Sequence, residues 1–333
     1  MPFLRPFKAG DMKKLIDVWN ESLVADPINA QRFMSNIVGD PAMESRGLPV
    51  IVDEQGTIIA FAYATVSYPK SRLGERNQGA VGWLNAIGIR SDKRRMGYGL
   101  QCMKAVRDYL ASYDCQSLNV AAFAPKYIMP GVDVDAYPVA PKFFKKAGFE
   151  AGSQVVSMQA DLQRFQVPRE IAERETEARS DGIIIETMSE EFLVSLLEFI
   201  HHDLGSGADR VIRQALGYGR NIRQIFVARD ANDVIGYCMY GIYDGNPERF
   251  GPFGVRPDQR GRHLGKILLY RCMQAMREDG LLTVWFKSTI EGSPAWHLYR
   301  RAGFRNIRRF STFVQKLPPQ VTGINGKSTF LVG

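Results

Sequence analysis

The 333-residue chain is long enough for two domains of ordinary size, and its 45% hydrophobic residues suffice for packed cores. A formal net charge of +8 and an isoelectric point near 9.3 indicate an anionic partner, whereas no run approaches the roughly 20 apolar residues that a membrane-spanning helix requires. The four cysteines lack the spacing of a zinc site, so we expect no metal. Few cysteines and no secretory signal predict a soluble, cytoplasmic protein.

The N-terminal part of the sequence predicts alternating strands and helices. Apolar residues at helical spacing, among them Leu15, Ile16 and Trp19, predict the first helix, and a turn at Gly56 separates two strands. We expect strands at 3–6, 48–52, 57–66, 81–89, 117–123 and 154–160, and helices at 12–23, 29–38, 97–113 and 140–147. Residues 128–138 are interpreted as an inserted loop that borders a substrate cleft.

The expected strand 81–89 leads into a glycine-rich basic turn and then a helix. Arg94 and Arg95 stand beside Gly97 and Gly99 in this turn. The first backbone N–H groups of a helix have no acceptor within the helix and carry partial positive charge. Together with the basic side chains, they predict a site for a pyrophosphate group.

Residues 161–181 mix acidic and basic side chains with helix-forming residues, which predicts a solvated, partly helical connector. Beyond it the alternation of strands and helices resumes. We expect strands at 183–186, 224–229, 234–243, 250–255, 281–287 and 309–316, helices at 190–202, 208–216 and 294–302, and a further helix that ends at 276.

Matching segments indicate that the chain is a tandem repeat. A second glycine-rich basic turn, with Arg260 and Gly265, follows the expected strand 250–255, as the first turn follows 81–89. Segment 143–149 likewise matches segment 298–304, and both end in Gly-Phe. Because the matched segments occur in the same order, the copies are co-linear.

At these residues the sequence resembles the GCN5-related N-acetyltransferases (GNAT), in a tandem arrangement similar to that of mycothiol synthase-like proteins. The acetyl-CoA signature of that family is Arg or Gln, two residues, Gly, one residue, then Gly or Ala. Arg94, Gly97 and Gly99 match it. In the second copy Arg260 and Gly265 match, but His263 replaces the first glycine, so a side chain projects where the backbone would approach the phosphates.

The resemblance implies an α/β fold with two tandem GNAT-like domains, each with a mixed, mostly antiparallel central sheet flanked by helices. We expect these domains at 1–160 and 182–317, with the charged connector at 161–181 between them and a tail at 318–333. Two packed copies in one chain are compatible with either a monomer or a homodimer.

The resemblance also implies an N-acetyltransferase that moves an acetyl group from acetyl-CoA to a primary amine of a small molecule or peptide. In that family a tyrosine four residues before the Gly-Phe pair often protonates the leaving thiolate, and Tyr299 occupies this position, whereas the first copy has Phe144. This favours the second copy as the catalytic half. The alternative interpretation of Tyr299 is that its ring packs on a buried helix face. Glu248 is the carboxylate expected to act as base.

The residues expected to bind acetyl-CoA are Ile87, Ile89, Arg94, Arg95, Met96, Gly97, Tyr98 and Gly99 in the first copy and Phe253, Val255, Arg260, Gly261, Arg262, His263, Leu264, Gly265 and Lys266 in the second.

Two other classes of function stay open. One is a non-catalytic acyl-CoA-binding regulator. The other is a transferase on a related fold that uses aminoacyl-tRNA, for which the basic run from Arg300 to Arg309 could hold RNA. The first turn argues against this second class, and without a zinc-finger spacing or an aromatic RNA-recognition motif we do not expect a nucleic-acid partner. The sequence does not identify the acceptor amine.

Overall fold

The computed structural model describes residues 1–68, 79–123, 128–204, 208–217, 219, 221–242 and 246–318. The first half of the chain forms β1 (Phe3–Pro6), α1 (Met12–Ser22), α2 (Ala30–Phe33), β2 (Pro49–Val52), β3 (Ile58–Ser67), β4 (Val81–Ile89), α3 (Tyr98–Ala111), β5 (Ser117–Val120), β6 (Val132–Asp133), α4 (Ala140–Lys146) and β7 (Glu150–Asp161). The second half forms α5 (Arg169–Ser180), β8 (Ile183–Thr187), α6 (Leu193–Phe199), α7 (Ala208–Gly217), β9 (Ile225–Asp230), β10 (Asp233–Tyr240), β11 (Phe250–Val255), α8 (Leu264–Glu278), β12 (Thr283–Ile290), α9 (Pro294–Arg301) and β13 (Arg305–Lys316).

These strands form two sheets. The larger sheet has nine strands in the order β1-β2-β3-β4-β5-β13-β7-β12, with β6 paired to β13, and the smaller has the order β11-β10-β9-β8. β4 and β5 run parallel, while the other paired strands of both sheets are antiparallel. The expected α/β class with mixed, mostly antiparallel sheets flanked by helices is therefore confirmed.

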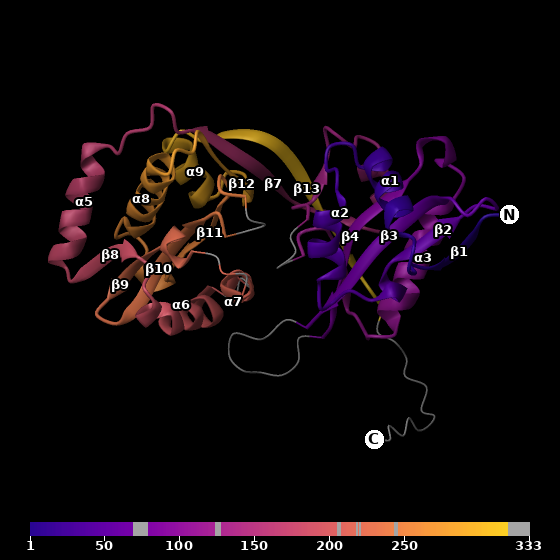
Figure 1. Ribbon diagram of the computed structural model, residues 1–333, viewed down its shortest axis with the longest axis horizontal. Helices are drawn as coiled ribbons and strands as arrows, with labels where there is room; N and C mark the ends of the chain where they lie inside the picture. Colours follow the sequence, from indigo (N-terminus) through magenta and orange to yellow (C-terminus); the bar gives the residue numbers. More distant parts are fainter. Residues whose placement is uncertain are drawn as a thin grey trace, which may run out of the picture.

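The last strand of each half pairs with the other half. β7 pairs with β12 from Val155↔Ile290 to Asp161↔Thr283, and β13 pairs with β5 from Phe313↔Val120 to Lys316↔Ser117. β7 and β13 also pair with each other. Figure 1 shows the two lobes of the molecule, with β7 and β13 crossing between them. The boundary between domains 1–160 and 182–317 remains a prediction, because one sheet contains strands from both segments.

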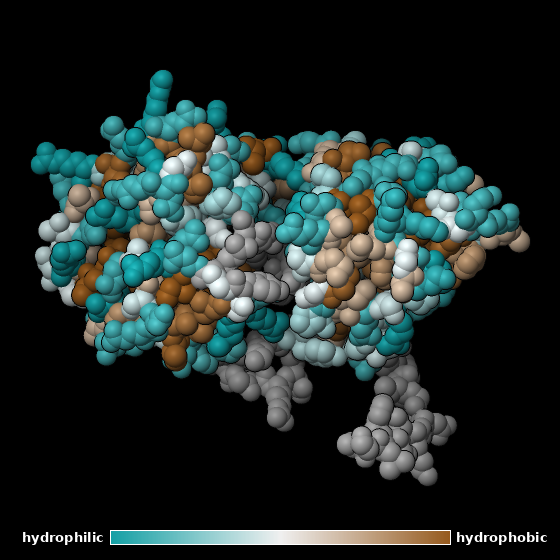
Figure 2. Space-filling view, in the orientation of Figure 1, coloured by the Kyte–Doolittle hydropathy of each residue, from teal (hydrophilic) through white to brown (hydrophobic). Residues whose placement is uncertain are grey.

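The hydrophobic cores follow this strand exchange. Val156 and Met158 of β7 are buried in the core under α8, whereas Phe313 of β13 is buried in the core of the first half, where its ring lies 5.4 Å from that of Phe144. Removing aromatic and branched side chains from water on both sides makes each half depend on a strand from the other. On the outside, Figure 2 shows mostly hydrophilic residues with separate hydrophobic patches on both lobes.

Several expected boundaries shift in the structure. The strand expected at 117–123 ends at Val120, because Ala121 and Ala122 adopt left-handed φ angles of 60° and 61°. β13 begins at Arg305 rather than 309, since pairing with β7 extends it. Residues 319–333 of the expected tail, 125–127 and residue 243 lie outside the described residues. None of the described helices has the length and apolar character needed to cross a membrane.

Candidate functional site

The first candidate site begins where β4 and β5 separate. The two strands pair in parallel only from Val81↔Ser117 to Leu84↔Val120. The N–H of Ala121 still donates to the Leu84 carbonyl over 2.8 Å, but the left-handed backbone at Ala121 then turns the chain away. β4 continues to Ile89 while paired with β3 on its other edge. The edge of β4 that faces β5 therefore borders an opening beyond Leu84.

The first turn, residues 94–99, lies at the far end of this opening. Gly97 precedes α3 with a left-handed φ of 87°, and its carbonyl accepts the N–H groups of Leu100 and Gln101 at 3.0 and 3.1 Å. The preceding N–H groups stand at the start of the helix, where no intrahelical acceptor exists, and Arg94 and Arg95 are exposed beside them. This arrangement favours an anion through both the helix dipole and the side-chain charges.

The opening and the first turn belong to one cavity of about 930 Å³, here called the first cleft. Its walls come from β4, the first turn, the end of β5, the C-terminal end of α1, segment 129–140 and α4. The lining includes Ile87, Ile89, Arg94, Arg95, Gly97, Tyr98 and Gly99. Met96, which was also expected here, is not among the lining residues and is 58% exposed. The loop expected to border a cleft does so through Gly131, Val132 and Tyr137.

The second turn, residues 260–265, repeats the backbone of the first. Arg94 has φ and ψ of −68° and 157°, and Arg260 has −67° and 152°. Three residues later, Gly97 and His263 both have left-handed φ angles, 87° and 59°. Since His263 has a Cβ, it holds this conformation at a cost that Gly97 avoids.

Carboxylates of the connector form ion pairs with two of the basic side chains around the second turn, those of Arg262 and Lys266. Glu170 of α5 pairs with Lys266, and Asp181 accepts from Arg262 over 3.0 Å. Further along α8, Arg271 pairs with Glu175. The hydrogen bond from Lys266 is the main reason why the pKa of Glu170 is lowered. An anionic ligand at the second turn would have to compete with these protein carboxylates.

Aromatic rings in the second half stand at positions equivalent to those that line the first cleft. The ring of Tyr299 lies 4.4 Å from that of Phe286, 6.1 Å from Phe250 and 6.3 Å from Phe253. Arg249, just before β11, forms a parallel bridge with Trp285 of β12, as Trp83 of β4 pairs with Asn119 of β5. This register and the matched motifs identify equivalent positions in the two halves, which are, in order, Leu84, Ile87, Val120 and Phe144 in the first half and Phe250, Phe253, Phe286 and Tyr299 in the second. At the first three of these positions the second half has an aromatic ring where the first half has a smaller aliphatic side chain.

The other residues expected in the second half are spread over different surroundings. Tyr299 is 7% exposed, and burial raises the pKa of its hydroxyl. Glu248 precedes β11, where its carbonyl accepts the Trp285 N–H over 3.1 Å. Leu264 is buried in the core, whereas Gly261 is exposed. A Cβ on Gly265 would meet the Phe253 ring at 3.1 Å and Val255 at 3.6 Å, so this glycine allows close packing of α8 on β11.

A polar network beside the first cleft was not predicted from the sequence. Tyr137, which lines the cleft, donates to the Asp26 carboxylate over 2.9 Å. Asp26 also accepts two hydrogen bonds from Arg308, whose Nε donates to Asp133 over 2.7 Å. Arg308 therefore belongs to an ion-pair network rather than to the continuous basic run considered above. No local pattern could have revealed it, because its members come from separate parts of the chain.

With this geometry described, the chain can be compared with known proteins. The model of the Acetyltransferase (GNAT) family matches residues 13–149 and 191–304. A mycothiol acetyltransferase from Saccharomonospora viridis is 30% identical over an alignment of 99 positions that covers 27% of this chain and 32% of that protein. The match therefore spans about a third of that relative.

Two solved structures share the fold at low sequence identity. The first is the GCN5-related glucosamine N-acetyltransferase region of a fungal multi-domain GH3 β-N-acetylglucosaminidase, with a TM-score of 0.79 and 16% identity over 94% of this chain and 38% of that chain. The second is a tandem GNAT protein from the clavulanic acid biosynthesis pathway, with a TM-score of 0.63 and 16% identity over 96% of this chain and 100% of that one. The second likeness extends to the tandem layout.

Proposed function

Because the chain belongs to the GNAT acetyltransferase family, we propose that it transfers the acetyl group of acetyl-CoA to a primary amine of a small molecule or peptide, with acetyl-CoA bound in the first cleft. The observation that carries this proposal is the continuity of the opened β4 edge with the anion-favouring first turn in one cavity of about 930 Å³. That volume lies in the upper part of the range of roughly 300–1,000 Å³ typical of ligand pockets.

The residues of the first cleft fit the chemistry of acetyl-CoA. Its phosphates match the first turn, where Gly97 leaves the backbone accessible and has no atom within 4 Å of an added Cβ. Its amide-containing arm matches the edge of β4 beyond Leu84, which does not pair with β5. The apolar lining from Ile87 and Phe143 suits the carbon chain of that arm.

The sequence favours the second half as the catalytic half because of Tyr299, and this remains the alternative. Two observations support the first half instead. Arg262 and Lys266 of the second turn are paired with carboxylates of the connector, and the aromatic rings around Tyr299 stand at positions equivalent to those that line the first cleft. We propose that the second half supports the first cleft and does not itself turn over acetyl-CoA.

Acetyl-CoA supplies an activated thioester, so the protein must hold a neutral amine near it and provide a proton for the departing sulfur. Tyr137 is the proton donor that we propose for the sulfur, and the proton that the attacking amine loses restores its hydroxyl. Burial and the nearby Asp26 carboxylate raise the pKa of its hydroxyl, which keeps it protonated at neutral pH. A protonated phenol that lines the cleft can donate a proton, whereas Phe144 cannot.

A matched pair of charge reversals tests the assignment of the cofactor site. Arg94 and Arg260 are both exposed and have nearly the same backbone angles, so Arg94→Glu and Arg260→Glu make the same change in the two turns. Calorimetric titration with acetyl-CoA should show one site per chain. We expect Arg94→Glu to weaken binding about tenfold or more, and Arg260→Glu to leave it unchanged.

If Arg260→Glu weakened acetyl-CoA binding and Arg94→Glu left it unchanged, the cofactor site would be assigned to the second half. Release of free CoA in the presence of amines, followed with a thiol reagent, then separates an enzyme from a binding protein. Binding of acetyl-CoA without CoA release for any amine would favour the acyl-CoA-binding regulator. Absence of acetyl-CoA binding to the unmodified chain would refute the proposed function.

A further inference from the structure

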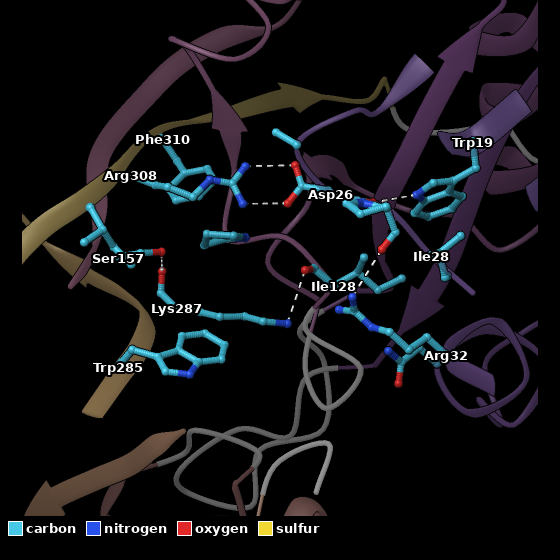
Figure 3. A pocket seen from close by; sticks show the side chains of 15 residues that line it. Trp19, Asp26, Ile28, Arg32, Ile128, Ser157, Trp285, Lys287, Arg308 and Phe310 are labelled. Carbon is cyan, nitrogen blue, oxygen red and sulfur yellow. Dashed lines mark hydrogen bonds and ion pairs between the residues drawn. The ribbon is translucent and has the colours of Figure 1, made fainter. Parts of the chain in front are cut away.

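A second, smaller pocket lies between the two halves of the chain. Its volume is about 190 Å³, and its lining includes residues of the loop after α1, of α2, of segment 128–130 and of β7, β12 and β13. Figure 3 shows Trp285 and Lys287 of the second half on one side and Ile28 and Arg32 of the first half on the other. Both halves are needed to form this inter-half pocket, because neither supplies all of its walls.

The inter-half pocket and the first cleft share two walls. In the loop after α1, Leu23 and Val24 line the first cleft, whereas the next four residues, 25–28, line the inter-half pocket. In the second shared wall, Met129 lines the first cleft and its neighbours Ile128 and Pro130 line the pocket. Neighbouring residues of the same two segments therefore face the two cavities, and the cavities adjoin each other.

A hydrogen bond also links the two cavities. The Tyr137 hydroxyl, on the cleft side, donates to Asp26, which lines the inter-half pocket. A substrate that contacts Asp26 in the pocket would thus be separated from the phenol that we propose as the proton donor by this one hydrogen-bonded carboxylate.

The lining of the inter-half pocket combines apolar side chains with three cationic side chains and one carboxylate among its described residues. Arg32, Lys287 and Arg308 are cationic, and Asp26 is the carboxylate among the described lining residues. Asp26 and Asp133 together compensate Arg308. Arg32 differs, since its guanidinium donates to the neutral Pro27 carbonyl over 3.2 Å. The planar guanidinium of Arg32 has further N–H donors in a geometry that matches a carboxylate.

We propose that the inter-half pocket binds the acceptor amine, and that this acceptor is a small amino carboxylic acid whose carboxylate pairs with Arg32. This inference rests on the proposed function, which supplies the requirement for an amine. The size agrees, since a cavity of about 190 Å³ corresponds to roughly six water molecules at ~30 Å³ each. The rings of Trp285 and Phe310 and the side chain of Ile307 would contact the apolar body of the acceptor. The second half then has a role in catalysis without binding acetyl-CoA, because it completes the acceptor pocket.

The test compares each of the twenty common amino acids with its α-carboxamide as acceptor, by steady-state CoA release. The amide keeps the amine and the side chain and removes only the negative charge. We expect at least one amino acid to be acetylated with a KM about tenfold or more below that of its amide. Arg32→Gln should abolish this preference by raising the KM of the acid, while the affinity for acetyl-CoA stays unchanged. Arg32→Lys should retain part of the preference, because it keeps the charge.

Arg164→Gln is the matched control, since Arg164 is exposed and lines neither cavity. It should leave the preference for the acid unchanged. Equal KM values for acids and amides, or an unchanged preference in Arg32→Gln, would overturn the inference. So would binding of acetyl-CoA without acetylation of any amino acid in the panel, and in that case the cofactor site would still stand.

If acetyl-CoA does not bind at all, the proposed function fails, and the pocket is tested by itself. Direct calorimetric titration of the same amino acids and amides into the unmodified chain and into Arg32→Gln then measures whether the pocket binds acids in preference to amides. Binding of acids in preference to amides that depends on Arg32 would support the pocket. Equal or undetectable binding of both would overturn it.

Discussion

The guanidinium of Arg308, on the last strand of the second half, donates hydrogen bonds of 2.8 and 2.9 Å to the carboxylate of Asp26 in the first half. The two residues are 282 positions apart in the sequence. Burial alone would lower the pKa of Arg308, but hydrogen bonds to Asp26 and Asp133 outweigh it and raise the pKa. This pair ties the exchanged strand β13 to the loop that forms a wall of both cavities.

Removal of the carboxylate from this pair should destabilise the whole chain. Asp26→Asn leaves the half-buried Arg308 with a weaker partner, and we expect the free energy of unfolding to fall by about 1.5–3 kcal/mol. Urea titration followed by circular dichroism measures the change. Glu291→Gln is the control, because its partner Arg309 is exposed, and we expect an effect below about 1 kcal/mol. Equal losses in the two variants would contradict a special role for the Asp26–Arg308 pair.

Asp11 should make the stability of the first half depend on pH. Burial alone would raise the pKa of Asp11, but two hydrogen bonds from Arg5 and one from the Lys8 N–H outweigh it and hold the pKa below its usual range. A lowered pKa stabilises the fold above the unfolded-state pKa of roughly 3.9, and this contribution is lost as the pH falls through the folded-state value. Asp11→Asn should therefore be less stable than the unmodified chain at pH 7, by about 1.5–3 kcal/mol.

The difference between the unmodified chain and Asp11→Asn should shrink as the pH falls below about 4, because Asp11 itself is then protonated. Denaturant titrations between pH 7 and pH 3 measure it. The exposed Asp108, paired with Lys104 on α3, offers the control Asp108→Asn, which should change stability little at any pH. A difference for Asp11→Asn that stays constant with pH would show that the charge of Asp11 is not the cause.

Exchange of the residues at equivalent positions of the two turns should have opposite effects on stability. His263→Gly removes the Cβ from a left-handed position with a φ of 59°, so we expect a gain of about 1 kcal/mol. Gly97→His places a Cβ at a φ of 87° and should cost about 1–2 kcal/mol, even though no atom lies within 4 Å of that Cβ. Thermal unfolding measures both, and a loss of stability in His263→Gly would indicate that the imidazole itself makes a stabilising contact.

Removal of single hydroxyl groups should distinguish the two halves as the place of catalysis. Tyr137→Phe should lower kcat about tenfold or more while the affinity for acetyl-CoA stays unchanged, because the first cleft loses its proposed proton donor. Tyr299→Phe should leave kcat unchanged, since its ring is packed against Phe286 and Phe253. The opposite result would favour the second half and the role of Tyr299 as acid. Tyr113→Phe, whose hydroxyl bonds Glu44 outside the cleft, is the control.

The parts of the site that depend on neighbouring residues could be predicted from the sequence. The two turns are examples, because a glycine or a short basic run acts on the backbone beside it, and both turns have the predicted strand–turn–helix context. The sequence also suggested that segment 128–138 borders a cleft, and several of its residues line one. By contrast, Met96 lies in the predicted motif but outside the cleft lining, where its side chain is exposed, since the direction of a side chain in a turn depends on the conformation of the folded backbone.

The sequence also could not predict the surroundings of residues whose partners are distant in the chain. Arg308 belongs to a basic run in the sequence, but its two carboxylate partners come from the loop after α1 and from β6. Tyr299 has the residue type and position of a proton donor, but the rings around it come from β11 and β12. Neither surrounding is encoded within a few residues of the side chain concerned.

By itself, the sequence determined the α/β class and the repeat, because periodicity and turn chemistry are local properties of the chain, and the resemblance of its motifs indicated the family. Only the tertiary structure decided that β7 and β13 pair with the opposite halves, that the second turn is engaged by connector carboxylates, and that a pocket forms between the halves. Such features depend on backbone hydrogen bonds and side-chain contacts between segments far apart in the sequence. Several pairings of strands with the same apolar pattern satisfy the local rules, and the packing of the complete cores selects one of them.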